Sequence, residues 1–439
     1  MTRYIPHTKE EQQQMLWSMG MESMDELYQD IPEEIKLDGP LPCMGEGMSE
    51  LELIRHVESL AKQNTIFPTI FRGAGAYRHF IPSVVKNVTA RNEFVTAYTP
   101  YQAETSQGLL QAIFEYQTMI SELTGLPISN ASLYDGATAA MEAANMCLDR
   151  KRKEVIVFSN GDKDYNQIIR TFLTPQGGRV ITIGHKDGLV DMDAYRAALN
   201  ENTACVYFQY PNFFGQVEDA KAIIHAAHGV GAKAIVGANP IALALYASPG
   251  ALGADICVGE GQPLGMPLSF GGPYLGFIAC EEGLMRKIPG RIVGQTVDNR
   301  GQRAFVLTLQ AREQHIRRER ASSAICSNQA LCALTAHAYL TAMGPKGLYD
   351  VASQCYNKAH YLQKALLEIG FAPSFSGEFF HEFVTECPVD AAMLEKHLAQ
   401  KGMLMGLPVC GKKRILWCVT EMVTVQEMDA LIAAIKEVL

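Results

Sequence analysis

The sequence predicts an α/β protein with a mostly parallel sheet, an N-terminal helical arm and a small C-terminal α+β domain. Between residues 91 and 344, short apolar segments alternate with helical segments, an order typical of a parallel sheet that is buried on both faces. Short helical patterns with proline-rich joints occupy residues 1–90, and helices and strands mix again over 345–439. We therefore expect three parts with these boundaries.

The arm should contain short helices with recognisable starts. Thr8 can cap a helix through KEEQQQMLWSM, Ser23 or Asp25 can start a second, and Ser49 can cap a third in SELELIRHVESLAKQN. A proline-rich joint precedes Ser49. We expect this arm to wrap around something larger, and a partner surface is the natural candidate.

The large domain should alternate strands and helices. Strands are expected at 155–159, 179–184, 204–210, 234–236, 254–258 and 275–280, because these segments are short, apolar and bounded by turn residues. Helices are expected at 109–125, from Asp135, from about Lys163, after Asp191, at 217–228 and from near Ser327. The alternation implies a sheet covered by helices on both sides.

The C-terminal domain should begin with a helix and contain three strand patterns. These lie in EFFHEFVTEC (378–387), MLMGLPV (403–409) and RILWCVT (414–420). A helix separates the first two patterns, and a closing helix runs to Leu439. This mixture predicts a compact α+β domain.

Composition excludes several classes of function. The 439 residues carry a net charge of −9, so no basic surface argues for nucleic acid or an anionic membrane. No run of eighteen apolar residues is present, and the N-terminal segment MTRYIPHTKEEQQQ lacks the apolar core of a secretory signal. We expect a cytoplasmic protein without a membrane partner.

The eleven cysteines do not form a recognisable metal or disulfide pattern. They are dispersed, none forms a C-x-x-C pair, and several lie in apolar strands. We therefore expect reduced thiols that act as small apolar side chains, and no metal site.

Six long blocks together resemble one known family. They are GAGAYRHFIP (73–82), TAYTPYQAETSQGLLQAIFEYQTMISELTG (96–125), SLYDGATAAMEA (132–143), YPNFFGQVED (210–219), GADICVGEGQPLGMPLSFGGP (253–273) and PGRIVGQTVDNRGQRAFVLTLQAREQHIRRERASSAICSNQAL (289–331). Across its whole length the chain is similar to glycine dehydrogenase (decarboxylating), the P-protein of the glycine cleavage system. The family has a fused form with two homologous halves and a split form, and this chain resembles the first half, the alpha subunit or subunit 1.

The resemblance implies the fold of the fold-type I transferases that use pyridoxal phosphate (PLP), of which aspartate aminotransferase is an example. In that class, one strand ends in an acid that pairs with the pyridine nitrogen, and a later turn presents the lysine that forms the Schiff base. Here Val236 and Gln262 stand at those places, and no lysine occurs between Lys233 and Arg286. The loop that usually supplies a stacking histidine offers Tyr165, which we expect to be a packed residue at a helix start.

By the same resemblance the chain is a non-catalytic subunit of an oxidoreductase. The complex decarboxylates glycine on PLP held by subunit 2 and passes the aminomethyl group to the lipoyl arm of the H-protein, so subunit 2 and the lipoylated H-protein are the expected partners in a heterotetramer. Two alternatives stay open: a self-sufficient PLP enzyme that uses an unusual lysine such as Lys233 or Lys287, and a non-enzymatic binding module on an inactive PLP fold.

The segment 132–140 has small residues at an expected helix start, as a phosphate-binding turn would. Asp135 could instead cap the helix, and its carboxylate would occupy the same N–H groups and repel phosphate. We favour capping. GAGAYR lacks the third glycine of a dinucleotide-binding motif and follows no clear strand, so we do not expect NAD to bind there.

A charged segment precedes the expected helix near Ser327. Its candidate interface residues are Arg312, His315, Arg317 and Arg318, with Ser327 after them. Interleaved acids suit a solvated helix face, whereas the guanidinium groups suit an interface beside a partner's active site, where they could hold phosphate or carboxylate. Both readings stay open.

A polar and aromatic segment precedes the helix at 109–125. By resemblance, Tyr98, Tyr101, Glu104 and Ser106 correspond to the mouth of an active site. From the residues alone, the segment could also be a helix entry that Thr105 or Ser106 caps.

Overall fold

The computed structural model describes residues 7–37, 39, 41, 43, 45, 47–95, 100–411 and 413–439. Its internal contacts divide the chain into two units, Met1–Ile66 and Phe67–Leu439. The structure's own division therefore falls between Ile66 and Phe67, while the domain boundary at residue 90 stays a prediction. No helix of the described part is long and apolar enough to cross a membrane.

The first unit consists of short helices. They are α1 (Lys9–Ser18), η1 (Met24–Tyr28), η2 (Glu33–Ile35) and α2 (Glu50–Ala61). Thr8 and Ser49 each form a capping box with a glutamate three residues later, as their positions predict. No residue of α2 is buried, and its leucines lie exposed.

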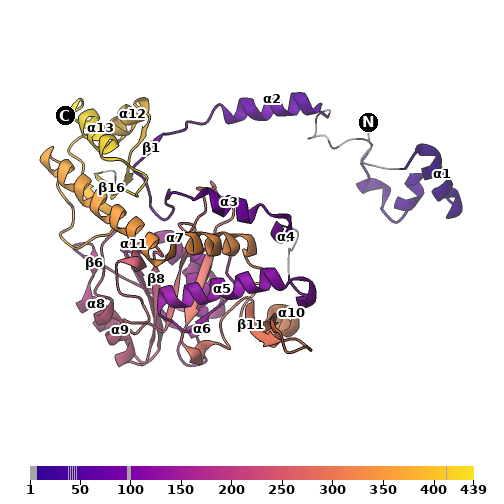
Figure 1. The fold of residues 1–439 in the computed structure, drawn as a ribbon, viewed down its shortest axis with the longest axis horizontal. Coiled ribbons are helices and arrows are strands. Elements are labelled where there is room, and N and C mark those ends of the chain that lie inside the picture. The colour runs from indigo at the N-terminus through magenta and orange to yellow at the C-terminus, as the bar shows by residue number, and fades with distance from the viewer. Residues whose placement is uncertain are drawn as a thin grey trace. The chain divides into compact units, whose positions relative to one another are not determined.

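The second unit is built on a seven-stranded sheet in the order β2-β10-β9-β8-β7-β3-β4. Figure 1 shows the helices of this unit around the sheet. Its strands are β2 (Ile128–Ser129), β3 (Glu154–Phe158), β4 (Arg179–Ile183), β7 (Thr203–Tyr210), β8 (Lys233–Ala238), β9 (Ile256–Glu260) and β10 (Gly276–Cys280). Five neighbouring strands, from β9 to β4, pair in parallel, and β10 runs antiparallel to both of its neighbours. The mostly parallel sheet is confirmed.

Helices cover both faces of this sheet. They are α5 (Gln107–Thr124), α6 (Gly136–Cys147), α7 (Lys163–Leu173), α8 (Met192–Ala198), α9 (Ala220–Gly229) and the long α11 (Ala330–Glu368). Core contacts place α6 and α7 on one face and α5, α8, α9 and α11 on the other. Short elements complete this layer: α3 (Ser83–Thr89), α4 (Asn92–Val95), β5 (His185–Lys186), β6 (Leu189–Val190) and α10 (Gln314–Arg317).

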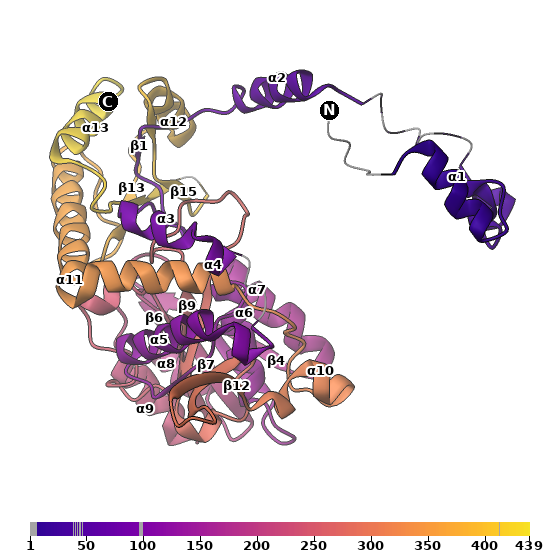
Figure 2. The same ribbon diagram turned by 45° about the vertical axis from the view of Figure 1, so that its right-hand side comes forward.

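Helix α11 links the sheet to a second core. It bends at Gly344, where φ is 60°, directly before Pro345. Figure 2 shows the two halves of α11 at an angle, the first beside α5 and the second beside α13. The second core contains a three-stranded sheet, β13 (Glu382–Glu386), β16 (Arg414–Cys418) and β15 (Leu407–Val409), with α12 (Ala391–Gln400) and α13 (Val425–Lys436).

Several features were not predicted from the sequence, among them two strand pairings. The segment 403–409 is split between β14 (Met403–Leu404), which pairs with β1 (Thr69–Ile70), and β15, which belongs to another sheet. A hairpin of β11 (Ile292–Val297) and β12 (Arg303–Thr308) lies in a segment for which we expected no secondary structure. Neither strand of that hairpin alternates cleanly between apolar and polar residues, so the pattern gave little signal.

Candidate functional site

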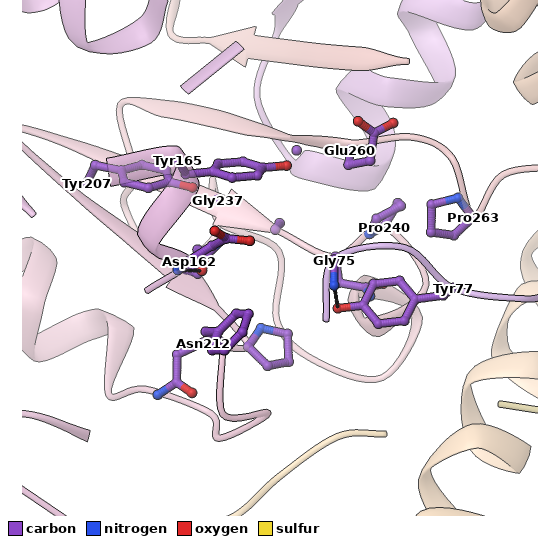
Figure 3. A pocket seen from close by; sticks show the side chains of 16 residues that line it. Gly75, Tyr77, Asp162, Tyr165, Tyr207, Asn212, Gly237, Pro240, Glu260 and Pro263 are labelled. Carbon is purple, nitrogen blue, oxygen red and sulfur yellow. Dashed lines mark hydrogen bonds between the residues drawn. The ribbon is translucent and has the colours of Figure 1, made fainter. Parts of the chain in front are cut away.

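A small cavity lies where the carboxyl ends of the parallel strands meet (Figure 3). The ends of β7, β8 and β9, the start of α7 and the loop around Tyr77 surround it. Its volume is about 70 Å³, well below the ~300–1,000 Å³ of a typical ligand pocket. Ligands of open α/β sheets bind at this edge, so the cavity is the candidate site. The polar residues that line it include Asp162, Gln209, Asn212, Asn239 and Glu260.

Two carboxylates occupy the N-terminus of α6, beside the cavity. Asp135 accepts a hydrogen bond from the Thr138 N–H at 2.7 Å, which confirms the predicted cap. Glu260 accepts from the Gly136 N–H at 3.0 Å and from the Leu275 N–H at 2.9 Å, and burial raises its pKa. Since these carboxylates already use the N–H groups, a phosphate here would meet negative charge instead of free donors.

Gln262 is fully buried and fully hydrogen-bonded. Its Oε1 accepts from the Tyr77 N–H at 2.9 Å, and its Nε2 donates to the carbonyls of Tyr77 and Met266, each at 2.8 Å. The side chain thus fixes the loop around Tyr77 on the edge of the sheet. A lysine could replace the donor but not the acceptor.

Val236 does not face the cavity. It packs with Phe208 against α8 and α9, on the face of the sheet opposite α6 and α7. The residues of β8 and its end that line the cavity are Gly237, Ala238 and Asn239. Because side chains alternate along a strand, an acid at position 236 would point away from a cofactor in this cavity.

Tyrosines form much of the cavity wall. Tyr165 lies in the first turn of α7, as expected for a residue at a helix start, and its ring borders the cavity (Figure 3). Tyr207 is buried, and its hydroxyl has no hydrogen-bond partner in the described part of the chain. Tyr77 donates to Glu382 at 2.7 Å, and burial raises the pKa of Glu382 to about 7.

The two alternative lysines lie away from the cavity. Lys233 begins β8, at the opposite end of the strand, and forms ion pairs with Asp255 at 2.7 Å and Glu281 at 2.5 Å. Lys287 donates to the Met146 carbonyl at 3.1 Å. Neither lysine lines the cavity, so the structure argues against a self-sufficient PLP enzyme that uses one of them.

PLP does not fit this cavity. None of the residues that line it is a lysine, arginine or histidine, and the helix N-terminus that would hold the phosphate carries two carboxylates. The volume is also too small for a phosphorylated pyridine ring. No catalytic step can be assigned to a cofactor bound here.

A second cluster gathers residues predicted at the mouth of a partner's site. Arg291 is 5% exposed and donates to the Tyr101 hydroxyl at 2.7 Å, to the Cys326 carbonyl at 3.1 Å and to Asn328 at 3.4 Å. In the sequence, Ser327 lies between Cys326 and Asn328. The structure therefore brings Tyr101 and Ser327 into one cluster around a buried guanidinium, and Arg291 is a member that we did not predict.

The charged segment divides into a buried and an exposed part. The Arg312 guanidinium donates to the carbonyls of Ile288 and Gly290, the latter at 2.6 Å, and burial lowers its pKa. In contrast, His315, Arg317 and Arg318 are exposed. Arg312 therefore fixes backbone, while the other three remain candidates for an interface.

The remaining mouth candidates are not drawn into this cluster. Glu104 is exposed beside a groove that Gln107 and Arg303 also line. The backbone of Ser106 begins α5, but its hydroxyl makes no capping bond, and the Thr105 hydroxyl donates to the Gln102 carbonyl instead. The alternative prediction, that the hydroxyl of Thr105 or Ser106 caps α5, is therefore wrong. Tyr98 lies outside the described residues.

One group of possible metal ligands is present although the sequence suggested none. Ligand atoms of His79, Cys355 and Glu421 lie within 4.8 Å of one another. Glu421 is 2.7 Å from His79 Nδ1 and 3.4 Å from Cys355 Sγ, distances that ordinary hydrogen bonds explain. The Lys358 ammonium also donates to the Glu421 carbonyl at 2.6 Å, which disfavours a cation there.

Sequence reasoning missed most of the cavity's polar lining. Asn239 and Glu260 occur at or just after strand ends, the position where ligands bind in such sheets, and this signal could have found them. Tyr77 comes from a loop outside the strand pattern, so no comparable signal marked it.

Comparisons with known proteins agree on one family. The profile described as the glycine cleavage system P-protein matches residues 2–435. A probable glycine dehydrogenase (decarboxylating) subunit 1 from Moorella thermoacetica is 49% identical over 99% of both chains, and its counterpart from Desulfitobacterium hafniense is 46% identical over 99% of both. An inhibitor-bound crystal structure of glycine decarboxylase (P-protein) superimposes with a TM-score of 0.93 at 42% identity, covering 100% of both chains.

More distant solved structures share the fold alone. An aspartate aminotransferase from Thermus thermophilus has a TM-score of 0.58 at 18% identity, over 84% of this chain and 98% of the other. The cysteine desulfurase CsdA from Escherichia coli has a TM-score of 0.62 at 15% identity, over 86% and 97%. These likenesses confirm the expected fold-type I architecture.

Proposed function

Because this chain belongs to the glycine cleavage system P-protein family, we propose that it is the non-catalytic subunit 1 of a two-subunit glycine dehydrogenase (decarboxylating). The enzyme that such subunits form decarboxylates glycine, and PLP is the cofactor of the complex. In our proposal, a separate subunit 2 holds PLP and glycine, and the aminomethyl group leaves on the lipoyl arm of the H-protein.

The observation that supports placing PLP on subunit 2 is that the described residues lining the cavity of this chain lack the groups that would bind PLP. Gln262 cannot form an imine, and its amide is fully used in fixing the Tyr77 loop. Asp135 and Glu260 make the helix N-terminus unsuitable for phosphate. We also move the pyridine-acid position from Val236 to Asn239, which lies at the end of β8 and lines the cavity. An amide there cannot hold a pyridine nitrogen protonated as a carboxylate does.

The proposed role of this chain is to complete the partner's site. In fold-type I dimers the active site lies at the subunit boundary. The cluster of Arg291, Tyr101 and Ser327 supplies polar groups, and Arg317 and Arg318 supply exposed positive charge. Neutral oxygens hold the Arg291 guanidinium, and a guanidinium group suits a phosphate or carboxylate that a partner brings.

A reconstitution experiment tests the proposal. The purified chain alone should form no Schiff base and should not decarboxylate glycine, whereas the mixture with subunit 2, H-protein and PLP should turn over. Borohydride reduction of the mixture followed by peptide mapping should place PLP on subunit 2 alone. PLP trapped on this chain at one equivalent would contradict the proposal, and full activity of subunit 2 by itself would favour the binding-module alternative.

A further inference from the structure

We propose that the cavity at the ends of β7, β8 and β9 binds a small organic cation, a primary ammonium group with at most a short apolar substituent. The inference rests on the charge, shape and lining of the cavity, and it does not depend on where PLP is bound in the complex. It assigns a ligand to a site that in related folds holds an anionic cofactor.

The first argument is the sign of the charge. Asp162 and Glu260 line the cavity, and no lysine, arginine or histidine is among its lining residues. Two further carboxylates lie next to residues around the cavity. Asp135 caps the adjacent helix α6, and Glu382 accepts a hydrogen bond from the hydroxyl of Tyr77, which lines the cavity. Burial raises the pKa of Asp162, Glu260 and Glu382 alike. A bound cation would offset the cost of these partly desolvated carboxylates.

The second argument is the presence of acceptors that face the cavity. Asp162 lines the cavity and caps α7 through Oδ1, which accepts from the Asp164 N–H at 2.8 Å. A Cβ added at Gly75, which also lines the cavity, would lie 3.7 Å from the Asp162 Oδ2. The Tyr207 side chain is only 1% exposed, and its hydroxyl, close to Gly237, makes no hydrogen bond of ordinary geometry to a described residue. The Gln209 amide is its polar neighbour and opposes the rise in the pKa of Tyr207 that burial causes. A buried hydroxyl without a partner costs stability, and an ammonium ion would supply the missing donor.

The third argument is shape. The rings of Tyr77, Tyr165 and Tyr207 border the cavity (Figure 3), and Phe213 also lines it. Aromatic side chains are typical of sites that recognise ammonium groups. A volume of about 70 Å³ exceeds the ~10–15 Å³ that one water requires but leaves room for only a few non-hydrogen atoms. Gly237 keeps the space open, because a Cβ there would lie 2.7 Å from the Tyr207 hydroxyl.

A hard metal ion suits the cavity less well. Calcium takes about six to eight oxygen ligands, and magnesium demands near-octahedral geometry. Glu260 contributes charge but few ligand positions, because its oxygens accept from the N–H groups of Gly136, Gln262 and Leu275. An ammonium ion needs fewer acceptors and gains from the tyrosine faces.

The test is a titration of the full chain with methylammonium chloride, followed by calorimetry and thermal unfolding. Sodium, potassium and tetramethylammonium chlorides at equal ionic strength are the comparison arms. Methylammonium should bind at one equivalent and raise the unfolding midpoint by several degrees at saturation, and the other salts should not. An equal response to sodium or potassium would overturn the assignment to an organic cation, and no salt-specific response at all would overturn the site.

Three variants locate the binding. Asp162→Asn keeps a residue that can cap α7 but removes the charge, so methylammonium affinity should fall at least about tenfold. Tyr207→Phe should weaken binding roughly three- to tenfold by removing one acceptor. Tyr116→Phe is the matched control, because Tyr116 also has a buried hydroxyl without a described partner yet does not line the cavity. If Tyr207→Phe binds like Tyr116→Phe and wild type, the proposal fails even if Asp162→Asn does not fold.

Discussion

Gln262 illustrates at the scale of one residue how a catalytic position becomes a structural one. Its amide joins the loop around Tyr77 to the turn at Met266 through three hydrogen bonds in a fully buried environment. A buried donor or acceptor left without a partner costs about 1–3 kcal/mol. The side chain that replaces lysine is therefore held by its own contacts.

Gln262→Lys should destabilise the chain and still fail to bind PLP. The ammonium cannot accept from the Tyr77 N–H, so we expect a loss of about 2–4 kcal/mol in the free energy of unfolding, measured by urea denaturation. Adding Asn239→Asp restores the acid but leaves Asp135 and Glu260 at the phosphate position. Firm PLP binding by Gln262→Lys alone would show that these two carboxylates do not block the site.

Glu142 predicts a pH-dependent contribution to stability. It is 1% exposed, accepts from the Ser323 hydroxyl at 2.9 Å, and burial raises its pKa to about 7. Between pH 4.5 and 7 the folded state then holds a proton that the unfolded state releases, so this carboxyl lowers the unfolding free energy as pH rises.

Glu142→Gln removes this carboxyl, so the variant should be about as stable as wild type near pH 4.5 and more stable above pH 7, by up to about 3 kcal/mol. Chemical denaturation at several pH values measures the difference. Glu10→Gln, at an exposed helix position, is the control. A constant difference between wild type and Glu142→Gln across this range would show that the carboxyl titrates normally.

At the scale of elements, the charged segment between β12 and α11 has one arginine that binds the backbone of its own chain and others that are exposed. The charge pattern in the sequence does not separate the two kinds. Arg312 fixes the backbone at Ile288 and Gly290, whereas Arg317 and Arg318 are exposed. A periodic charge pattern indicates a helix face, but it does not say which charged side chain turns inward.

Arg312→Ala and Arg317→Ala should therefore differ in kind. Arg312→Ala leaves two carbonyls without donors and should lower the unfolding free energy by about 2–4 kcal/mol. Arg317→Ala should change it by at most about 0.5 kcal/mol but weaken assembly with subunit 2, measured by analytical ultracentrifugation. If Arg317→Ala and Arg318→Ala both assemble and turn over like wild type, this part of the segment is only a solvated face.

At the scale of the whole molecule, the chain has a folded body and an N-terminal unit with little core of its own. Leu16 is the one buried residue among the described helices of that unit, whereas Phe67–Leu439 contains the main cores. The exposed leucines of α2 agree with the expectation that the arm covers a partner.

Removal of residues 1–66 should leave the body folded and impair assembly. Trp417 is fully buried in the body and Trp17 lies in the removed part, so tryptophan fluorescence of the truncated chain reports the body alone. Full-length Trp17→Phe is the matched control and should unfold at the same temperature within a few degrees. Unfolding of the truncated chain well below the control would show that the arm stabilises its own body.

Much of the fold could be predicted from local patterns. The strands and helices that were expected in the large domain lie within a few residues of their expected bounds, although short elements such as β2 and the β5–β6 pair were not expected. The caps at Thr8, Ser49 and Asp135 form as predicted, because each depends on residues close in the sequence. The β11–β12 hairpin was missed because its strands lack a clear period. The absence of the Schiff-base lysine could be recognised from the sequence alone, because the lack of lysine between Lys233 and Arg286 can be read without knowing the positions of side chains.

The sequence by itself determined the family, the mostly parallel sheet and the loss of the Schiff-base lysine, because long blocks, hydrophobic periodicity and residue identity are all written along the chain. Only the tertiary structure decided that the Val236 side chain points to the face of the sheet away from the cavity. It also decided that Glu260 joins Asp135 at the start of α6, and that Tyr77 lines the cavity. The physical reason is that side-chain direction and contacts between distant segments depend on how strands pair and helices pack. Neighbouring residues do not fix these.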